Sequence, residues 1–307
     1  MQFRQLEYFV AVAEERHFAR AAARCFVSQP ALSAGIAKLE AELGVALINR
    51  VHAYEGLTPE GERLVGWARR ILAEHDALKA EVSAMQHGVG GTLRLGVGPT
   101  TAVTTVSITR AFCAQHPLVR VQVTEHLSAS ELHQRLRDFE LDAGIAYLTP
   151  DDQGGLEVLP LYEERYVLAG APALMPTDVA QCGWVDAARL PLVLLNERMR
   201  VRQVIDDAFG AHGVDVDPQV VAESVASLLA YIQDGQWATI APHTILTQSP
   251  GTTGLRTLPL VDPEITVNVV LAINAAARQA AAVRAFATTA ASLTLRERLR
   301  YVHPASP

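Results

Sequence analysis

Hydroxyl side chains follow two of the strands that the sequence predicts. Thr100 and Thr101 come directly after a strand expected over residues 92–97, and Ser128 follows one expected over 119–125. Small anions bind where strand ends meet helix N-termini, because hydroxyl and backbone N–H groups donate hydrogen bonds there. Ser128 also forms a capping-box pattern with Glu131, so helix capping and ligand contact are equal alternatives for it.

Aromatic and basic side chains follow two further strands. Tyr147 comes after a strand expected over residues 143–146, and Arg198, Met199 and Arg200 follow one expected over 192–195. A guanidinium suits a carboxylate, because it donates two parallel hydrogen bonds to it. Most arginines are solvated at the surface, which is the alternative for Arg200. These residues predict a pocket for a small anionic or polar ligand.

Catalytic motifs are missing from the sequence. It contains no HExxH, GxSxG or Walker-type GxxxxGK, and no GxGxxG that opens a strand–helix unit. Its histidines lack metal-ligand spacing, and Cys25, Cys113 and Cys182 lie far apart. The sequence predicts neither an enzyme nor a bound metal or cofactor. A redox switch remains an alternative, and it would need a paired or activated thiol.

The first fifty-eight residues have the pattern of a helix-turn-helix with a wing. Helices are expected over residues 6–15, 18–25 and from Ser28, which is an N-cap residue followed by Pro30. On the third helix Ile36, Leu39 and Leu43 are expected to face inward, and Gly44 ends it. Residues 47–58 carry a turn signal between two short β-compatible pieces, which predicts the wing. An ordinary three-helix bundle is the alternative.

A long helix is expected from Pro59 to about Gln86. Apolar side chains recur along it at spacings of four and three, with one polar position, His75, in the row. A helix of this length needs a partner, so a coiled-coil seam between two copies is predicted, with these positions in it: Leu64, Ala68, Ile71, His75, Leu78, Val82 and Met85. Residues 87–91, rich in glycine, predict a flexible hinge.

The chain after the hinge alternates between strand and helix patterns, which is typical of an α/β domain. Besides the four strands above, strands are expected over 166–170, 220–222, 238–241 and 266–273. Residues 1–58 hold six Lys or Arg and six Asp or Glu, whereas residues 88–307 hold sixteen and twenty-two. The net charge of −7 therefore belongs mainly to the C-terminal part and disfavours a purely architectural DNA protein.

The sequence gives no sign of a membrane segment. It has no run of about twenty uncharged apolar residues, and polar and charged positions follow Met1 at once instead of a signal-peptide core. We therefore expect a cytoplasmic protein without a membrane partner. An enzyme or a transport-type solute-binding protein with an added helical extension is the competing class, and the missing signal peptide disfavours secretion.

Five short strings, in this order and spacing, resemble the LysR-type transcriptional regulators, and the likeness extends along essentially the whole chain. The strings are Leu6-Glu7-Tyr8-Phe9, Phe18-Ala19-Arg20-Ala21-Ala22, Val27-Ser28-Gln29-Pro30-Ala31-Leu32-Ser33, Leu39-Glu40-Ala41-Glu42-Leu43-Gly44 and Leu57-Thr58-Pro59-Glu60-Gly61. The resemblance implies that the third helix enters the major groove of double-stranded promoter DNA. The residues expected to face DNA are Ser28, Gln29, Pro30, Ser33 and Lys38, with Arg50 in the wing.

Two positions depart from the family pattern. Basic residues usually found after the recognition-helix serine and in the wing are replaced by Ala34 and Ala53, although His52 adds a weak basic group. Because phosphate contacts need Lys and Arg, we expect weaker and more salt-sensitive DNA binding than is usual.

The resemblance implies an α/β fold made of an N-terminal winged helix-turn-helix (1–58), a linker and dimerisation helix (59–87) and a two-lobed, periplasmic-binding-protein-like effector domain (88–307). Lobe one would comprise 88–163 and 269–307, and lobe two 164–268. A small-molecule effector, with a carboxylate as the preferred class, would bind between the lobes. Trp237, which replaces a family glycine, would narrow the pocket or pack. The resemblance also implies a dimer through the linker helix, a tetramer, and contact with RNA polymerase.

Overall fold

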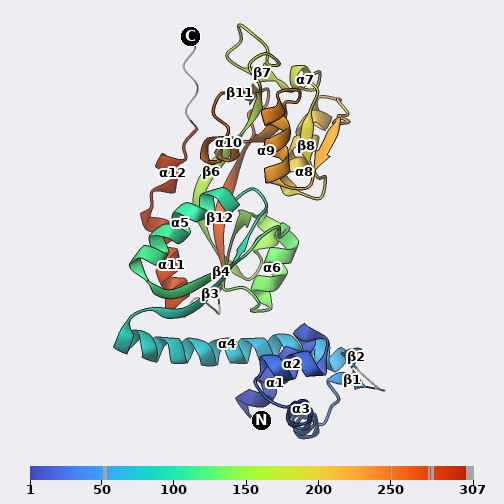
Figure 1. The fold of residues 1–307 in the computed structure, drawn as a ribbon, viewed down its shortest axis with the longest axis vertical. Helices are drawn as coiled ribbons and strands as arrows, with labels where there is room; N and C mark the ends of the chain where they lie inside the picture. Colours follow the sequence, from blue (N-terminus) through green and yellow to red (C-terminus); the bar gives the residue numbers. More distant parts are fainter. Residues whose placement is uncertain (51–53, 250, 276, 278–279, 302–307) are drawn as a thin grey trace.

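The computed structural model describes residues 1–50, 54–249, 251–275, 277 and 280–301. Its N-terminal part contains three helices and a two-stranded antiparallel wing, as predicted (Figure 1). The tip of the wing, with His52 and Ala53, lies outside the described residues. These elements are α1 (Phe3–Glu15), α2 (Phe18–Arg24), α3 (Gln29–Leu43), β1 (Ile48–Arg50) and β2 (Tyr54–Leu57).

Helix α3 begins and ends where its sequence requires. The Ser28 hydroxyl accepts a hydrogen bond from the backbone N–H of Ala31, at 3.4 Å, and Gly44 ends the helix in a left-handed conformation. Leu32, Ile36 and Leu39 are its buried side chains. The prediction that Leu43 faces inward is wrong, because the inward stripe at helical spacing runs through Leu32 instead and leaves Leu43 exposed.

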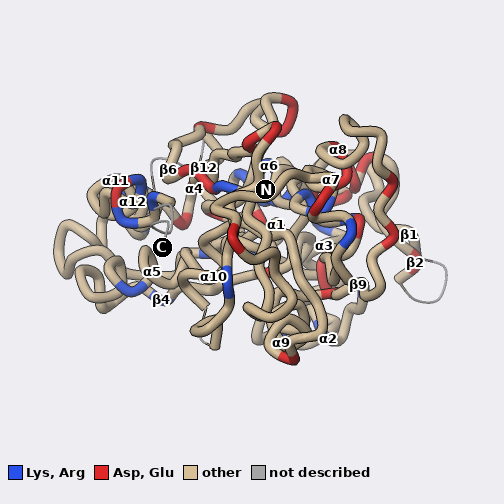
Figure 2. The backbone as a smooth tube through the Cα atoms, turned by 90° about the horizontal axis from the view of Figure 1, so that it is seen from above, with Lys and Arg blue, Asp and Glu red and all other residues tan. Residues whose placement is uncertain are grey.

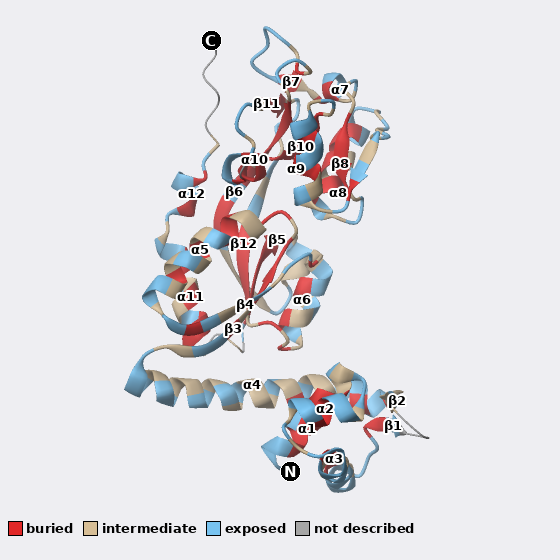
Figure 3. Cartoon of the chain, viewed as in Figure 1, coloured by how far each residue is buried: buried red, intermediate tan, exposed pale blue. Residues whose placement is uncertain are grey.

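Helix α4 (Pro59–His87) has two different faces along its length. Its first half packs on the helix-turn-helix, where Ala68 is buried and Leu64 and Ile71 are partly buried in the same core. Its second half exposes Leu78, Val82 and Met85, which are 64%, 51% and 78% exposed (Figure 3). The positions predicted to form the coiled-coil seam therefore fall into two groups. Leu64, Ala68 and Ile71 pack within this chain, and Leu78, Val82 and Met85 are exposed and could contact a partner.

The expected hinge is shorter than residues 87–91. Gly88 ends α4 with a positive φ, but Gly90 and Gly91 already belong to strand β3 and pair with Leu118 and Val119. The predicted flexibility of Gly90 and Gly91 is therefore wrong, because a neighbouring strand pairs with their backbone.

The remaining elements form the two-lobed α/β region. Its main sheet has the order β4-β3-β5-β12-β6-β11-β7, with β10 paired to β6, and β8 and β9 form a parallel pair. The strands are β3 (Gly90–Val97), β4 (Leu118–Thr124), β5 (Ala143–Tyr147), β6 (Leu156–Gly170), β7 (Cys182–Gly183), β8 (Val193–Leu195), β9 (Val220–Ala222), β10 (Thr239–Pro242), β11 (Arg256–Val261) and β12 (Thr266–Asn274). The eight predicted strands are present, whereas β7, β11 and the first part of β6 are additional.

Helices pack around the strands of each lobe (Figure 1). They are α5 (Ala102–Gln115), α6 (Ala129–Arg137), the 3-10 helix η1 (Pro150–Gln153), α7 (Trp184–Ala187), α8 (Arg200–Ala211), α9 (Val225–Asp234), α10 (His243–Gln248), α11 (Ala281–Ser292) and α12 (Leu295–Arg298).

Two hydrophobic cores, one in each lobe, are joined by the long strands β6 and β12. Residues 156–162 of β6 pair with 269–274 of β12 beside the first core, which contains Phe112, Tyr162 and Phe286. Residues 166–170 of β6 pair with β10 and β11 beside the second core, which contains Trp184 and Phe209. The long strands β6 and β12 are therefore the structural connection between the two lobes.

Candidate DNA interface and ligand cavity

The first turn of α3 is an exposed polar surface. Ser28, Gln29 and Pro30 are exposed, Ser33 is half-buried, and Lys38 is exposed further along the helix. The Ser28 hydroxyl already caps the helix, so it presents one remaining lone pair and its proton. Arg50 lies in strand β1, and its side chain is outside the described residues.

The two arginines of the neighbouring helix α2 are already paired with carboxylates. Arg24 of α2 binds Glu14 with an Nη1–Oε2 distance of 2.6 Å, and Arg20 lies 3.6 Å from Glu15. Lys and Arg positions are interspersed with Asp and Glu along the whole chain in Figure 2. The surface is therefore poorer in unpaired positive charge than a helix-turn-helix with a basic face, which limits non-specific affinity for phosphate.

A cavity of 790 Å³ lies between the two lobes. Lobe one contributes the segments after β3, β4 and β5, and lobe two contributes the β8–α8 turn and the residue after β9. The cavity brings together five of the seven residues expected to contact a ligand: Thr100, Ser128, Tyr147, Met199 and Arg200.

The other two expected residues do not line this cavity. The Thr101 hydroxyl is buried and donates to the backbone oxygen of Ile145, at 2.8 Å, so it ties the turn after β3 to β5. Trp237 packs edge-on against Tyr231, with ring centroids 5.3 Å apart, at the margin of the lobe-two core. Both side chains therefore have a structural role: Thr101 through a hydrogen bond and Trp237 through packing.

Sequence reasoning missed several polar residues of the cavity wall. Asn196 donates to Glu223, with an Nδ2–Oε1 distance of 2.7 Å, and Gln203 lies within 3.4 Å of Arg200 Nη1. Glu223 follows strand β9 directly, so the rule that located Thr100 and Tyr147 would have found it too. Asn196 directly follows strand β8, so the same rule would have found it, whereas Gln203 lies within α8 and offered no such signal.

Three helices begin at the cavity, and only one is capped by its own side chain. Ser128 and Glu131 form the expected capping box on α6, and these hydrogen bonds lower the pKa of Glu131. Helices α5 and α8 begin at Thr101 and Met199 without a side-chain cap. Of these two helices, only α8 has first-turn residues, Arg200 and Val201, in the cavity wall. Its first backbone N–H groups are thus available to an anion, which the helix dipole also favours.

Charged groups around the cavity differ in whether they are already paired. Asp152 accepts from Thr149 at the start of η1, with an Oγ1–Oδ2 distance of 2.7 Å, and Glu131 accepts from Ser128. Arg198 and Arg200, at the uncapped start of α8, are exposed to the cavity. These two carboxylates are satisfied within lobe one, and Glu223 of lobe two accepts from Asn196. A ligand would meet the two arginines of lobe two together with Asp151, an exposed carboxylate of η1.

Buried polar groups with unused hydrogen-bonding capacity lie where the lobes join. The hydroxyls of Tyr147 and Tyr166 and one oxygen of Glu164 have no partner among the described residues. Burial raises the pKa of Glu164 to about 8, although Thr244 donates to its other oxygen. Burial also raises the pKa of Tyr166, and Arg200 acts in the opposite direction. Arg200 therefore lies within electrostatic range of the strand that joins the lobes.

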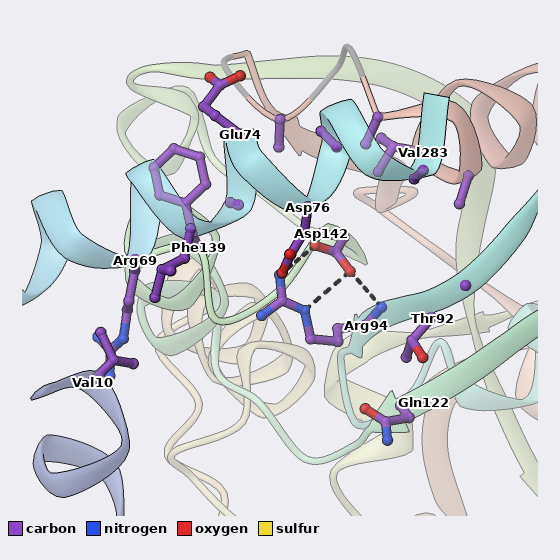
Figure 4. Close-up of a pocket in the computed structure, with 18 of the residues that line it drawn as sticks. Val10, Arg69, Glu74, Asp76, Thr92, Arg94, Gln122, Phe139, Asp142 and Val283 are labelled. Atoms are coloured by element: carbon purple, nitrogen blue, oxygen red, sulfur yellow. Dashed lines mark hydrogen bonds and ion pairs between the residues drawn. The ribbon is translucent and has the colours of Figure 1, made fainter. Parts of the chain in front are cut away.

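A second cavity, of 610 Å³, lies between α4 and lobe one (Figure 4). Inside it Arg94 donates two hydrogen bonds to Asp142, at 2.6 and 3.1 Å. Arg69 of α4 connects Glu14 of α1 with Glu140 of lobe one, at 3.4 and 2.8 Å. Farther along α4, Glu81 accepts from Arg284 of α11, at 2.8 Å. Ion pairs thus join the DNA-binding half to lobe one.

Among the described residues, no group of three or more His, Cys, Asp or Glu is arranged to hold a metal ion. In the same part of the chain no helix is both long and apolar enough to cross a membrane.

A winged helix-turn-helix followed by a two-lobed domain with a central cavity defines a DNA-binding regulator that responds to a ligand. The profile of the bacterial regulatory helix-turn-helix protein, lysR family, matches residues 3–62, and that of the LysR substrate binding domain matches residues 86–293. The chain therefore belongs to the LysR family of transcription regulators, and its C-terminal domain is the effector-binding domain of that family.

Relatives match over nearly the full length. The chain is 34% identical to the probable hydrogen peroxide-inducible genes activator of Streptomyces viridosporus, over 90% of this chain and 89% of the relative. It is 32% identical to the DNA-binding transcriptional dual regulator OxyR of Escherichia coli strain K12, over 86% of each.

Solved structures of full-length regulators have the same fold. A variant of OxyR from Pseudomonas aeruginosa matches with a TM-score of 0.75 and 26% identity, over 96% of this chain and 99% of the other. CbnR in complex with its target DNA matches with a TM-score of 0.65 and 25% identity, over 95% of this chain and 99% of the other.

Proposed function

We propose that this regulator responds to a small carboxylate that binds between its lobes, and that it has no catalytic activity of its own. The observation that carries the proposal is the uncapped start of α8, where Arg198 and Arg200 flank backbone N–H groups at the wall of the cavity. Thr100 and Tyr147 would complete the site from lobe one, with Met199 as an apolar contact. Ser128 remains a weaker candidate because it caps α6.

The domain division that follows from this proposal is 1–58, 59–87 and 88–307, with lobe boundaries at 163/164 and 268/269. It is supported by the change of core along β6, since Tyr162 packs in one core and Tyr166 in the other. Ligand bound to both lobes would favour their closed arrangement, because it contacts both walls only when the strands bend.

DNA would be contacted by Ser28, Gln29, Pro30, Ser33 and Lys38 of α3 and by Arg50 of the wing. We propose a dimer through the exposed half of α4 and a tetramer through the effector domains, which would span two sites on one promoter and bend the DNA between them. Lobe closure would change the angle between dimers, relax the bend and permit contact with RNA polymerase.

The experiment is a thermal-shift screen of the full chain with small mono- and dicarboxylates, each paired with its uncharged amide. A true effector is expected to raise the Tm by about 5–10 °C when its free concentration is about a hundred times its Kd. Arg200→Gln should abolish the shift, because the carboxylate loses its bidentate partner. Arg189→Gln, which changes an exposed arginine just after α7, should leave it intact.

Absence of any shift with all carboxylates, or equal shifts with acid and amide, would contradict the proposal. A ligand-dependent rise in Tm that persists in Arg200→Gln would show that the ligand binds elsewhere on the chain.

Redox sensing is the second candidate, favoured by the likeness to hydrogen peroxide-inducible activators. Burial raises the pKa of Cys25 and Cys182, which disfavours the reactive thiolate, and no cysteine is among the residues that line the cavity between the lobes. Replacing Cys113 and Cys182 together by serine tests this candidate. An oxidant response of DNA binding that disappears in this variant would support it, and an unchanged response would remove it.

A further inference from the structure

Phe26 has an unfavourable backbone conformation and an exposed apolar side chain, and neither contributes to the hydrophobic core. Its φ is +56°, in the left-handed region that large side chains rarely adopt, and its side chain is 95% exposed. Its neighbours Cys25 and Val27 both pack on the helix-turn-helix core. The chain therefore holds this one phenyl ring outward, between two inward side chains.

The left-handed conformation belongs to the end of α2. The backbone N–H of Phe26 donates to the oxygen of Ala23, at 3.1 Å, and that of Val27 donates to the oxygen of Ala22, at 3.0 Å. These two hydrogen bonds define a Schellman motif, in which the left-handed position is normally glycine. Gly44 and Gly235 occupy the left-handed positions that end α3 and α9, and Phe139 occupies the same position after α6. Phe139 is buried there, whereas Phe26 is exposed. A phenylalanine that takes this conformation without being buried points to a role outside the fold.

The surface beside Phe26 is the one that meets DNA in a helix-turn-helix. Phe26 lies two residues before Ser28, the N-cap of α3, and residues 28–31 are exposed. The N-terminal residues of the recognition helix contact base edges in the major groove. Ala34 supplies no charge there, and the exposed polar groups of Ser28 and Gln29 are neutral. Phe26 therefore adds an apolar contact to the polar ones that this end of α3 offers.

We propose that Phe26 contacts the apolar surface of bound DNA, either a thymine methyl group or a deoxyribose, and contributes to operator affinity. This inference rests on DNA binding by the helix-turn-helix and not on the identity of the effector.

The test uses the full-length chain and the duplex most enriched when that chain is incubated with sheared DNA of its own genome. Anisotropy titrations compare the original chain with Phe26→Asn, which tolerates the left-handed conformation, and with Phe26→Tyr, which keeps an aromatic ring. Phe26→Asn should weaken binding about tenfold, as expected for partial burial of one ring, while Phe26→Tyr stays within about twofold. Val179→Asn, at another exposed apolar position, should have no effect.

Two further measurements separate contact from misfolding. The Tm of Phe26→Asn should be unchanged or higher, because the backbone cost is relieved, and the dependence of log Kd on log salt should keep its slope, because no phosphate contact is lost. Repeating the titration with uracil in place of thymine identifies the surface. A thymine methyl contact predicts that the advantage of Phe26 disappears, and a deoxyribose contact predicts that it persists.

Equal affinity of Phe26→Asn and the original chain would overturn the proposal. A weaker affinity together with a lower Tm or a dissociated dimer would overturn it as well, since Phe26 would then serve the fold or a second copy of the chain.

Discussion

Glu164 shows how one residue connects the two lobes. It is fully buried in β6 opposite Val267 of β12, with Thr244 donating to one oxygen and the other unpaired. An ionised carboxylate there would be strongly disfavoured, which is why burial raises its pKa to about 8. The protonated side chain is therefore part of the folded structure at neutral pH.

A pH-dependent stability follows from this raised pKa. The folded state holds a proton that the unfolded state releases near its ordinary value, so the contribution of Glu164 is full below the unfolded pKa and is lost as pH rises towards 8. As pH rises through this range, the loss of the Glu164 contribution should lower the free energy of unfolding by at most about 1.4 kcal/mol per pH unit. Glu164→Gln should remove this slope between roughly pH 5 and 8.

Urea unfolding at several pH values measures the difference between the two chains. The curve of the variant is subtracted from that of the original chain because a second group also titrates. Burial lowers the pKa of His243, so its contribution to stability is lost as pH decreases, opposite to that of Glu164. Parallel curves for the original chain and Glu164→Gln would show that Glu164 is not protonated in the folded state.

In the linker helix α4, the first half packs within this chain and the second half is exposed. Its first half is fastened to the helix-turn-helix: a Cβ at Gly61 would lie 2.1 Å from the oxygen of Leu47, so only glycine permits this approach. Its second half carries Leu78, Val82 and Met85 without cover. Exposed apolar side chains at this spacing are expected to be buried by a second copy.

Charges placed on this second half should therefore break the dimer. Leu78→Asp combined with Val82→Asp should weaken dimerisation at least about a hundredfold, because an unpaired carboxylate in an apolar interface is strongly disfavoured. Sedimentation equilibrium measures the change. Ser83→Asp, which adds one carboxylate at the neighbouring exposed position, is compared with Val82→Asp alone as the control. A stable dimer in the double variant would place the interface elsewhere.

At the scale of the whole molecule, helix α4 lies beneath lobe one (Figure 1), and ion pairs connect the two. Arg69 with Glu140 and Arg284 with Glu81 are the contacts across this boundary, and each carboxylate is about one third exposed. Such pairs contribute little to stability, typically about 0.2–1 kcal/mol. Their value lies in selecting one arrangement of the two halves.

Removing both carboxylates should loosen this arrangement without unfolding the chain. Glu81→Gln combined with Glu140→Gln is expected to shift the Tm by no more than about 2–4 °C, but to speed proteolytic cleavage at Gly88 and enlarge the radius of gyration. Asp186→Asn, which removes the exposed ion pair between Asp186 of α7 and Arg189, is the matched control. Unchanged cleavage and scattering would mean that packing alone sets the arrangement.

Local sequence was sufficient where the physical cause is local. The caps at Ser28 and Thr58, the wing hairpin, the linker helix and the eight expected strands follow from short-range hydrogen bonding and from the period of the apolar residues. The same holds for the rule that polar side chains after strands gather at one end of a sheet, which brought Thr100, Tyr147 and Arg200 to one cavity.

Tertiary structure decided which of these side chains remain available to contact a ligand. Thr101 follows the same strand as Thr100, yet its hydroxyl is used by Ile145 of a neighbouring strand, and Trp237 is taken up by packing against Tyr231. Gly90 and Gly91 became strand because β4 lies beside them. In each case the deciding partner is distant in sequence, so its position depends on how the whole chain packs, which no local pattern encodes.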